Sequence, residues 1–124
     1  MKGNAIIERT MLGYEDHGIL TCFLYLVQTG SGQGFGGYVL DDIPKKNERG
    51  DRVGDRRSSI LCGFWIKRIL EVVGVDKWEA LVGKHIRVDG TNFGTITGIG
   101  HIIEDKWFYP NKEIKEMRNE STMD

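Results

Sequence analysis

The stretch I-L-T-C-F-L-Y-L-V-Q at positions 19–28 decides the fold class. Apolar side chains fill both alternating sets of positions, one set being Leu20, Cys22, Leu24 and Leu26 and the other Phe23, Tyr25 and Val27. Successive side chains of a strand point to opposite faces, so this run predicts a strand that is central in its sheet or covered on both faces. Residues 6–12 predict a second strand, and a turn bounded by glycines at 13–18 joins the two as an antiparallel hairpin.

Further along the chain the pattern predicts one long helix. Ser58 or Ser59 is the expected N-cap, and Gly74 ends the helix after Val73. Its apolar positions cover more than half of the helical circumference and are Leu61, Trp65, Ile66, Ile69, Leu70, Val72 and Val73. So wide an apolar arc predicts a helix covered by the sheet and by a second surface, and a partner subunit is one candidate for that surface.

Two further strands are expected at 85–89 and 95–103, around a turn at 90–94. Gly98 and Gly100 fall on the same face of the second strand. Glycine has no side chain to cover a sheet, so the pair predicts a bare strip where a ligand or another backbone can come close.

The remaining helical signals are short. Residues 76–79 resemble a capping box that opens a helix ending near position 81. Residues 111–124 predict a weak C-terminal helix and tail, with Ile114 and Met117 turned inward. The whole chain of 124 residues is predicted to be one α+β domain, 1–124. In this domain an antiparallel sheet packs with one main helix and shorter C-terminal helices.

Composition excludes several functional classes. The chain has 17 basic and 18 acidic residues and a net charge of −1, which argues against a nucleic-acid polymer as partner. No run is long and apolar enough for a membrane span, and residues 1–5 lack a signal-peptide pattern. Cys22 and Cys62 lie in apolar surroundings, which favours free thiols in a reducing, cytosolic compartment. No metal or cofactor motif is present.

The 17 glycines exceed ordinary usage and concentrate in T-G-S-G-Q-G-F-G-G at 29–37. We expect a loop here that leads into a short strand at 38–40, so the motif is neither a dinucleotide fingerprint nor a P-loop. Free N–H groups of such a loop can wrap an anion. Gln33 would supply hydrogen bonds and Phe35 a stacking face. The alternative is a hairpin connection with a bulge.

Arg56 and Arg57 stand directly before the main helix. Two guanidinium groups next to the N–H groups of a helix start are suited to a phosphate. The alternative is a capped helix after a solvated loop, because residues 41–57 are highly charged and read as one long surface loop. That length exceeds the usual range of loops, which favours a function for the segment.

Asn92 and Phe93 occupy the tip of the turn at 90–94, where an amide and a ring can read a base edge and stack on the base. The alternative is an ordinary Asn-containing β-turn. The three histidines, His17, His85 and His101, are far apart and show no metal-ligand spacing. With no nucleophile signature either, the sequence favours a binding protein over an enzyme.

Four strings together resemble one family. They are L-G-Y-E-D-H-G-I-L-T at 12–21, S-G-Q-G-F-G-G-Y at 31–38, R-I-L-E-V-V-G-V-D-K-W-E-x-L-x-G-K-H-I-R-V at 68–88 and I-G-H-I-I-E-D-K-W-F-Y-P at 99–110. The chain resembles the phage anti-Thoeris signal-sponge family. The resemblance implies capture, without turnover, of glycocyclic ADP-ribose messengers made by bacterial TIR-domain enzymes. It also implies a homodimer or larger assembly with pockets near the subunit interface, acting in the cytoplasm of the infected bacterium.

The groups singled out above suit such a ligand, which carries an adenine, two riboses and a pyrophosphate. Tight capture on an open surface is hard to achieve, so residues 41–57 are expected to order over the ligand. Two other functions stay open: a hydrolase of the same messenger, and an inhibitor that binds a host protein directly.

Overall fold

The computed structural model describes residues 2–15, 18–44, 46–52, 54, 56–91 and 94–122, with side chains to 119. Six strands form one antiparallel sheet in the order β3-β2-β1-β6-β7-β8. They are β1 (Lys2–Glu15), β2 (Ile19–Gln28), β3 (Ser31–Gly36), β6 (His85–Gly90), β7 (Ile96–Gly100) and β8 (Trp107–Phe108). A second, two-stranded sheet pairs β4 (Asp41–Asp42) with β5 (Arg57–Ser58). The helices are α1 (Ile60–Val73), the short 3-10 helix η1 (Trp78–Ala80) and α2 (Pro110–Thr122). The predicted α+β class is confirmed.

The first two strands form the predicted hairpin, and β2 has the predicted bounds. The strand β1 is longer than expected and contains a bulge between Ile7 and Arg9, which leaves Glu8 as the extra residue. A bulge bends and twists a strand. The sheet curls enough to bring β3 near β7, although three strands separate the two in the hydrogen-bonded order.

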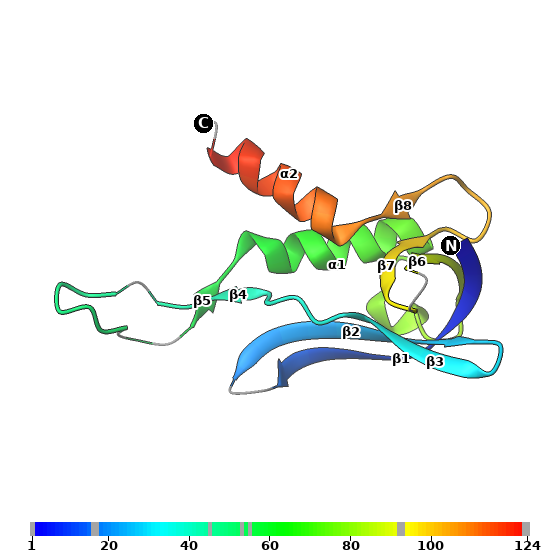
Figure 1. Ribbon diagram of the computed structural model, residues 1–124, viewed down its shortest axis with the longest axis horizontal. Coiled ribbons are helices and arrows are strands. Elements are labelled where there is room, and N and C mark those ends of the chain that lie inside the picture. Colours follow the sequence, from blue (N-terminus) through cyan, green and yellow to red (C-terminus); the bar gives the residue numbers. More distant parts are fainter. Residues whose placement is uncertain are drawn as a thin grey trace.

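The two faces of β2 have different surroundings. Cys22, Leu24 and Leu26 are at most 1% exposed and pack in the core. On the opposite face Val27 is 36% exposed. The first of the two predicted alternatives is confirmed, because β2 is a central strand that pairs with β1 on one side and β3 on the other. The helices cover only one of its faces, since α1 and α2 lie on the same side of β1 and β2 (Figure 1).

Both predicted ends of the main helix are confirmed. The Leu61 N–H donates to Ser59 Oγ at 3.0 Å, which makes Ser59 the N-cap. Gly74 ends the helix with φ of 86°, a conformation that glycine adopts without strain. The buried face of α1 places Trp65 at the centre of the core, where its ring packs 5.5 Å from Phe35 and 5.3 Å from Phe108.

The glycine-rich segment is a strand and not a loop, because residues 31–36 pair with β2 as β3. Residues 38–40, which were expected to be a strand, lie outside regular structure. The highly charged segment after them is an extended arm. Its base is the β4–β5 pair, and Lys46 and Arg52 form an antiparallel bridge nearer the tip. Figure 1 shows the arm extending away from the sheet and helices.

The second half of the sheet corrects three predictions. The expected capping box is wrong, because Lys77 occupies the N-cap of η1 and makes no side-chain cap hydrogen bond. The strand predicted over 95–103 ends at Gly100. Aromatic side chains of the same chain fill the space that was expected to be bare over Gly98 and Gly100. A Cβ at Gly98 would lie 2.6 Å from the Tyr109 ring, and one at Gly100 would lie 2.7 Å from Trp107.

The C-terminal helix is confirmed, with Ile114 buried and Met117 packed on the core. It is joined to α1 by Arg68, whose Nε donates to Glu113 Oε1 at 2.8 Å. The other carboxylate oxygen of Glu113 accepts from the Tyr109 N–H at 2.9 Å, at the start of α2. Within the described residues, no helix has the length and apolar character that crossing a membrane requires.

Candidate functional site

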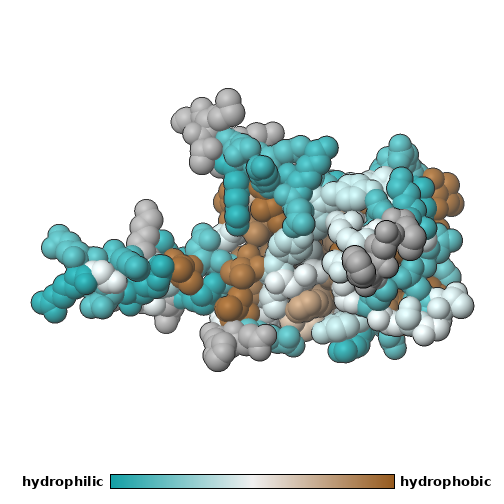
Figure 2. All heavy atoms as spheres, viewed as in Figure 1, coloured by the Kyte–Doolittle hydropathy of each residue, from teal (hydrophilic) through white to brown (hydrophobic). Residues whose placement is uncertain are grey.

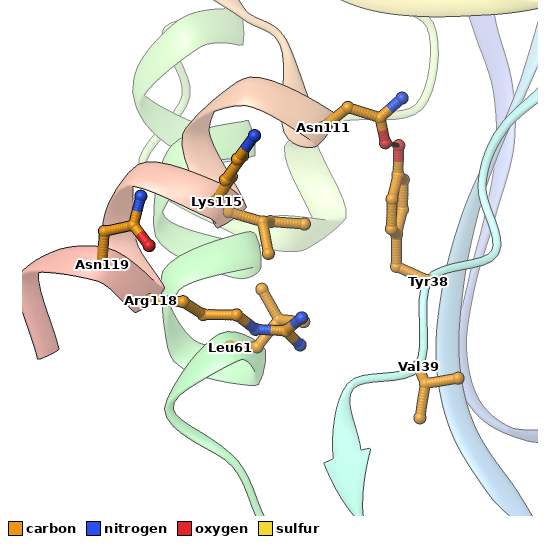
Figure 3. Close-up of a pocket in the computed structure, with 8 residues that line it drawn as sticks. Tyr38, Val39, Leu61, Asn111, Lys115, Arg118 and Asn119 are labelled. Atoms are coloured by element: carbon orange, nitrogen blue, oxygen red, sulfur yellow. Dashed lines mark hydrogen bonds between the residues drawn. The ribbon is translucent and has the colours of Figure 1, made fainter. Parts of the chain in front are cut away.

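A pocket of about 510 Å³ opens between α2, the start of α1 and the chain at 38–39. Its lining combines two cations, two amides, a tyrosine and three aliphatic side chains: Lys115, Arg118, Asn111, Asn119, Tyr38, Val39, Leu61 and Ile114. Figure 3 shows Lys115, Arg118 and Asn119 projecting from α2 on one side and Tyr38 and Val39 on the other. Small-molecule sites usually have volumes of about 300–1,000 Å³ and a few polar groups in apolar walls.

The helical period explains why these polar residues gather. Asn111, Lys115, Arg118 and Asn119 are spaced i, i+4, i+7 and i+8, so they lie along one face of α2. The inward position of Ile114 anchors the helix to the core and holds that face over the pocket. Figure 2 shows the hydrophilic surface of α2 beside a hydrophobic area where the arm meets the rest of the chain.

Tyr38 fixes the opposite wall. Its ring lies 5.3 Å from that of Trp65, and its hydroxyl donates to Asn111 Oδ1 at 2.6 Å. Burial raises the pKa of Tyr38, so the hydroxyl stays protonated as a donor at neutral pH. Since this bond occupies the amide oxygen of Asn111, its NH₂ group remains to donate to a ligand.

The pocket can therefore offer positive charge, amide donors and a mainly apolar wall in one place. Guanidinium and ammonium groups bind phosphate oxygens, and an aromatic or aliphatic wall accommodates a planar base. None of the side chains described in this lining is a carboxylate, histidine or cysteine.

Gln33 lies elsewhere, in a smaller hollow of about 190 Å³ at the curled end of the sheet. The hollow is lined by Gln28, Gln33, Thr91 and Gly94 together with residues of β1, β6 and β7. Gln33 Oε1 is buried and has no hydrogen-bond partner among the described residues. A Cβ at Gly94 would lie 3.2 Å from Gln33 Nε2, so Gln33 faces the turn that follows β6.

This position brings Gln33 to the turn that carries Asn92 and Phe93. Those two residues lie outside the described part of the chain, and their expected roles as ligand contacts stay predictions. At about 190 Å³ the hollow is smaller than the roughly 300–1,000 Å³ of typical small-molecule sites.

Phe35 does not belong to a ligand surface, which corrects the stacking role expected for it. The side chain is 1% exposed, its ring stacks on Trp65 at an interplanar angle of 18°, and its edge meets Phe108. In a strand, Gln33 and Phe35 share one face, and this face of β3 is turned toward α1. The ring that was expected to meet a base is therefore part of the core.

The two arginines have separate roles. Arg56 makes a two-pronged ion pair with Asp41, Nε to Oδ2 at 2.8 Å and Nη2 to Oδ1 at 2.7 Å, which fastens the base of the arm. The Arg56 guanidinium holds the pKa of Asp41 below its ordinary value. Arg57 is exposed on β5. The hydroxyl of Ser59 is used as a helix cap and Arg56 is paired with Asp41, so the role of Arg57 in a phosphate site at the start of α1 stays a prediction.

The structure thus separates the predicted groups. Gln33 faces Gly94, whereas Arg56 and Arg57 lie at the base of the arm, where β5 is labelled in Figure 1. Sequence reasoning missed the pocket under α2. The i, i+4, i+7 and i+8 spacing of the amides and cations along α2, on the face next to Ile114, could have indicated this pocket.

The cysteines and the possible metal ligands remain to be placed. Cys22 and Cys62 are free thiols, as predicted, and burial raises the pKa of Cys22 to about 11, which keeps it protonated. No group of three His, Cys, Asp or Glu residues within the described ranges is arranged to hold a metal ion. No protein-family model, curated protein or solved structure matches the chain.

Proposed function

We propose that this protein is a phage anti-defence protein that binds a cyclic ADP-ribose-type nucleotide and sequesters it without degrading it. Removal of that messenger in the cytoplasm of the infected bacterium would block Thoeris immunity. The proposal includes self-association into a dimer or larger assembly. The observation that carries it is the pocket under α2, where Lys115 and Arg118 meet the amides of Asn111 and Asn119 beside Tyr38.

The size and chemistry of this pocket support a nucleotide ligand. A volume of about 510 Å³ falls within the range of small-molecule sites. Lys115 and Arg118 are three residues apart on α2, which puts their charges on adjacent turns where one pyrophosphate can meet both. The Tyr38 ring and the aliphatic wall suit the base, and the amides suit ribose hydroxyls and base edges.

Binding without turnover is supported by the residue types around the pocket. Hydrolysis of a glycosidic or phosphate bond ordinarily uses a carboxylate, a histidine, an activated nucleophile or a metal. The lining described above offers amides, cations and apolar groups in their place. Because the described lining residues include no carboxylate, histidine or cysteine, a cation pair that holds the ligand there favours retention over cleavage.

The arm can contribute to retention. Val39 lines the pocket and lies two residues before β4, so the base of the arm borders the ligand site. The arm itself extends away from α2 in Figure 1, and its closure over a bound ligand stays a prediction.

The test is isothermal titration with a glycocyclic ADP-ribose isomer, followed by mass analysis of the ligand recovered after denaturation. We expect tight binding and an intact ligand. Lys115→Ala and Arg118→Ala should each weaken binding by about 1.5–3 kcal/mol, roughly tenfold to more than a hundredfold, as expected for loss of a charge-assisted hydrogen bond.

Lys112→Ala is the matched control, because Lys112 carries the same charge on the same helix, is exposed and does not line the pocket. Equal affinity of all three variants and the wild type would remove the pocket from the site. A ligand of altered mass would replace sequestration by hydrolysis.

A further inference from the structure

The face of β1 and β2 that points away from the helices carries mostly apolar side chains, with Arg9 as its one charged member. Strand register assigns its cross-strand pairs, which are Ile6 with Val27, Arg9 with Tyr25 and Met11 with Phe23. We call these six residues the outer face. The alternate pairs, such as Ile7 with Leu26 and Thr10 with Leu24, point to the core.

The composition of the outer face is unusual for a sheet surface in water. An antiparallel sheet with one solvated face normally alternates apolar residues inside with polar residues outside. Here the outward positions of β2 are Phe23, Tyr25 and Val27. Both helices lie on the opposite side (Figure 1), and Ile6 and Val27 are 38% and 36% exposed. Met11, Phe23 and Tyr25 are half-buried, so the face is a largely apolar surface that neither helix covers, and such a surface suits a protein interface.

The shape of the outer face is complementary to the same face of a second copy. Phe23 and Tyr25 stack on each other with centroids 5.9 Å apart and form a ridge along β2. The neighbouring positions on β3, opposite Tyr25 and Val27, are Gly34 and Gly32. A hollow of about 200 Å³ lies there between β1, β2 and β3, beside the ridge.

Charges of both signs border this hollow. Glu8, the extra residue of the β1 bulge, and Arg9 are both exposed and both line it. The Arg9 guanidinium lies 3.7 Å from the centroid of the Tyr25 ring. In a dimer with two-fold symmetry, every contact between two different residues occurs twice. If Glu8 of one copy pairs with Arg9 of the other, Arg9 of the first copy therefore also pairs with Glu8 of the second.

We propose that the outer face is an isologous interface with a second copy of this chain. In this interface, the Phe23–Tyr25 ridge of each copy enters the glycine hollow of the other, and Glu8 of each copy pairs with Arg9 of its partner. The inference locates the self-association that the proposed function includes, and it rests on that part of the proposal and not on the ligand pocket.

The first experiment is sedimentation analysis of the wild type, Val27→Glu and Ile103→Glu. The wild type should sediment at twice the 14.1 kDa of one chain. Val27→Glu places two carboxylates against each other's apolar surface and should weaken the dimer at least tenfold. Ile103 is 83% exposed and outside the outer face, so Ile103→Glu should leave the dimer unchanged. A wild type that stays monomeric up to about 1 mM would overturn the proposal.

A charge exchange tests the pairing itself. Glu8→Arg and Arg9→Glu should each weaken the dimer, because each brings like charges together, and the double exchange should restore it. Dimers that persist in Val27→Glu and in both single exchanges would place the interface elsewhere. A double exchange that remains as weak as the single variants would refute the pairing.

Circular dichroism and nucleotide titration of the same variants separate the two proposals. A folded, monomeric Val27→Glu that binds the nucleotide supports the interface and leaves the pocket intact. A wild-type dimer that binds no nucleotide would contradict the proposed function alone. A monomeric wild type that captures a host protein through this face would overturn the second-copy proposal.

Discussion

Replacing Phe35 by alanine separates a core residue from a ligand contact. The side chain is 1% exposed and packs on Trp65 and Phe108, so its removal leaves a cavity beside these two aromatic rings. Phe→Ala substitutions in cores cost about 3–5 kcal/mol of unfolding free energy. For 124 residues the entropy of unfolding near the midpoint is about 0.26 kcal/mol/K, which converts this cost to a Tm lower by about 12–19 °C.

The assay is calorimetric unfolding of the wild type, Phe35→Ala and Phe35→Leu, with nucleotide affinity measured at a temperature where each is folded. Phe35→Leu keeps an apolar side chain in the core and should cost only about 1–2 kcal/mol. The affinity per folded molecule should stay the same for all three. An unchanged Tm for Phe35→Ala together with a tenfold loss of affinity would refute the placement of this ring in the core.

Other substitutions test local features of the fold. Gly98→Ala should destabilise the protein by at least about 1 kcal/mol, because the new Cβ would overlap the Tyr109 ring. Gly63 is an exposed residue in the middle of α1, so Gly63→Ala should stabilise the protein by about 1 kcal/mol. Thermal unfolding measures both changes. Burial and the hydrogen bond to Asp89 raise the pKa of Tyr109 to about 12, so its contribution to stability is complete below pH 10 and declines as the pH rises from 10 to 12. Tyr109→Phe should show a smaller alkaline decline in denaturant titrations, and an identical decline would contradict the assignment. His101 Nδ1 accepts hydrogen bonds from the N–H groups of Ile103 and Glu104. His101→Ala should therefore lower the free energy of unfolding by about 1–2 kcal/mol, and His101→Asn, which keeps an acceptor, should lower it less. Equal losses in unfolding experiments would rule out this role.

Much of the fold was predictable because its signals are local. The bounds of β2, the hairpin with β1, the Ser59 and Gly74 ends of α1 and the inward face of α2 each depend on residues within a few positions of one another. The errors arose where neighbouring residues fit two structures. The alternating glycines of 31–36 suit a loop, yet they pair with β2 as a strand because the apolar Phe35 has a place in the core.

The candidate site was less predictable, since it depends on contacts between distant residues. Arg56 reads as a phosphate ligand in sequence, but Asp41, which binds it, lies 15 residues earlier. The wall of the α2 pocket depends on Tyr38 and Asn111, which are 73 residues apart. No local pattern indicates that such residues meet.

The sequence by itself determined the β1–β2 hairpin, the strand β6, the ends of α1 and the inward face of α2, because backbone propensity, capping and periodicity act over one or two turns. Only the tertiary structure decided which polar groups share a pocket, which glycine strip is filled and which face of β2 stays uncovered. The curl of the sheet and the docking of both helices on one side set these outcomes. They follow from packing the whole chain around Trp65 and not from any short segment.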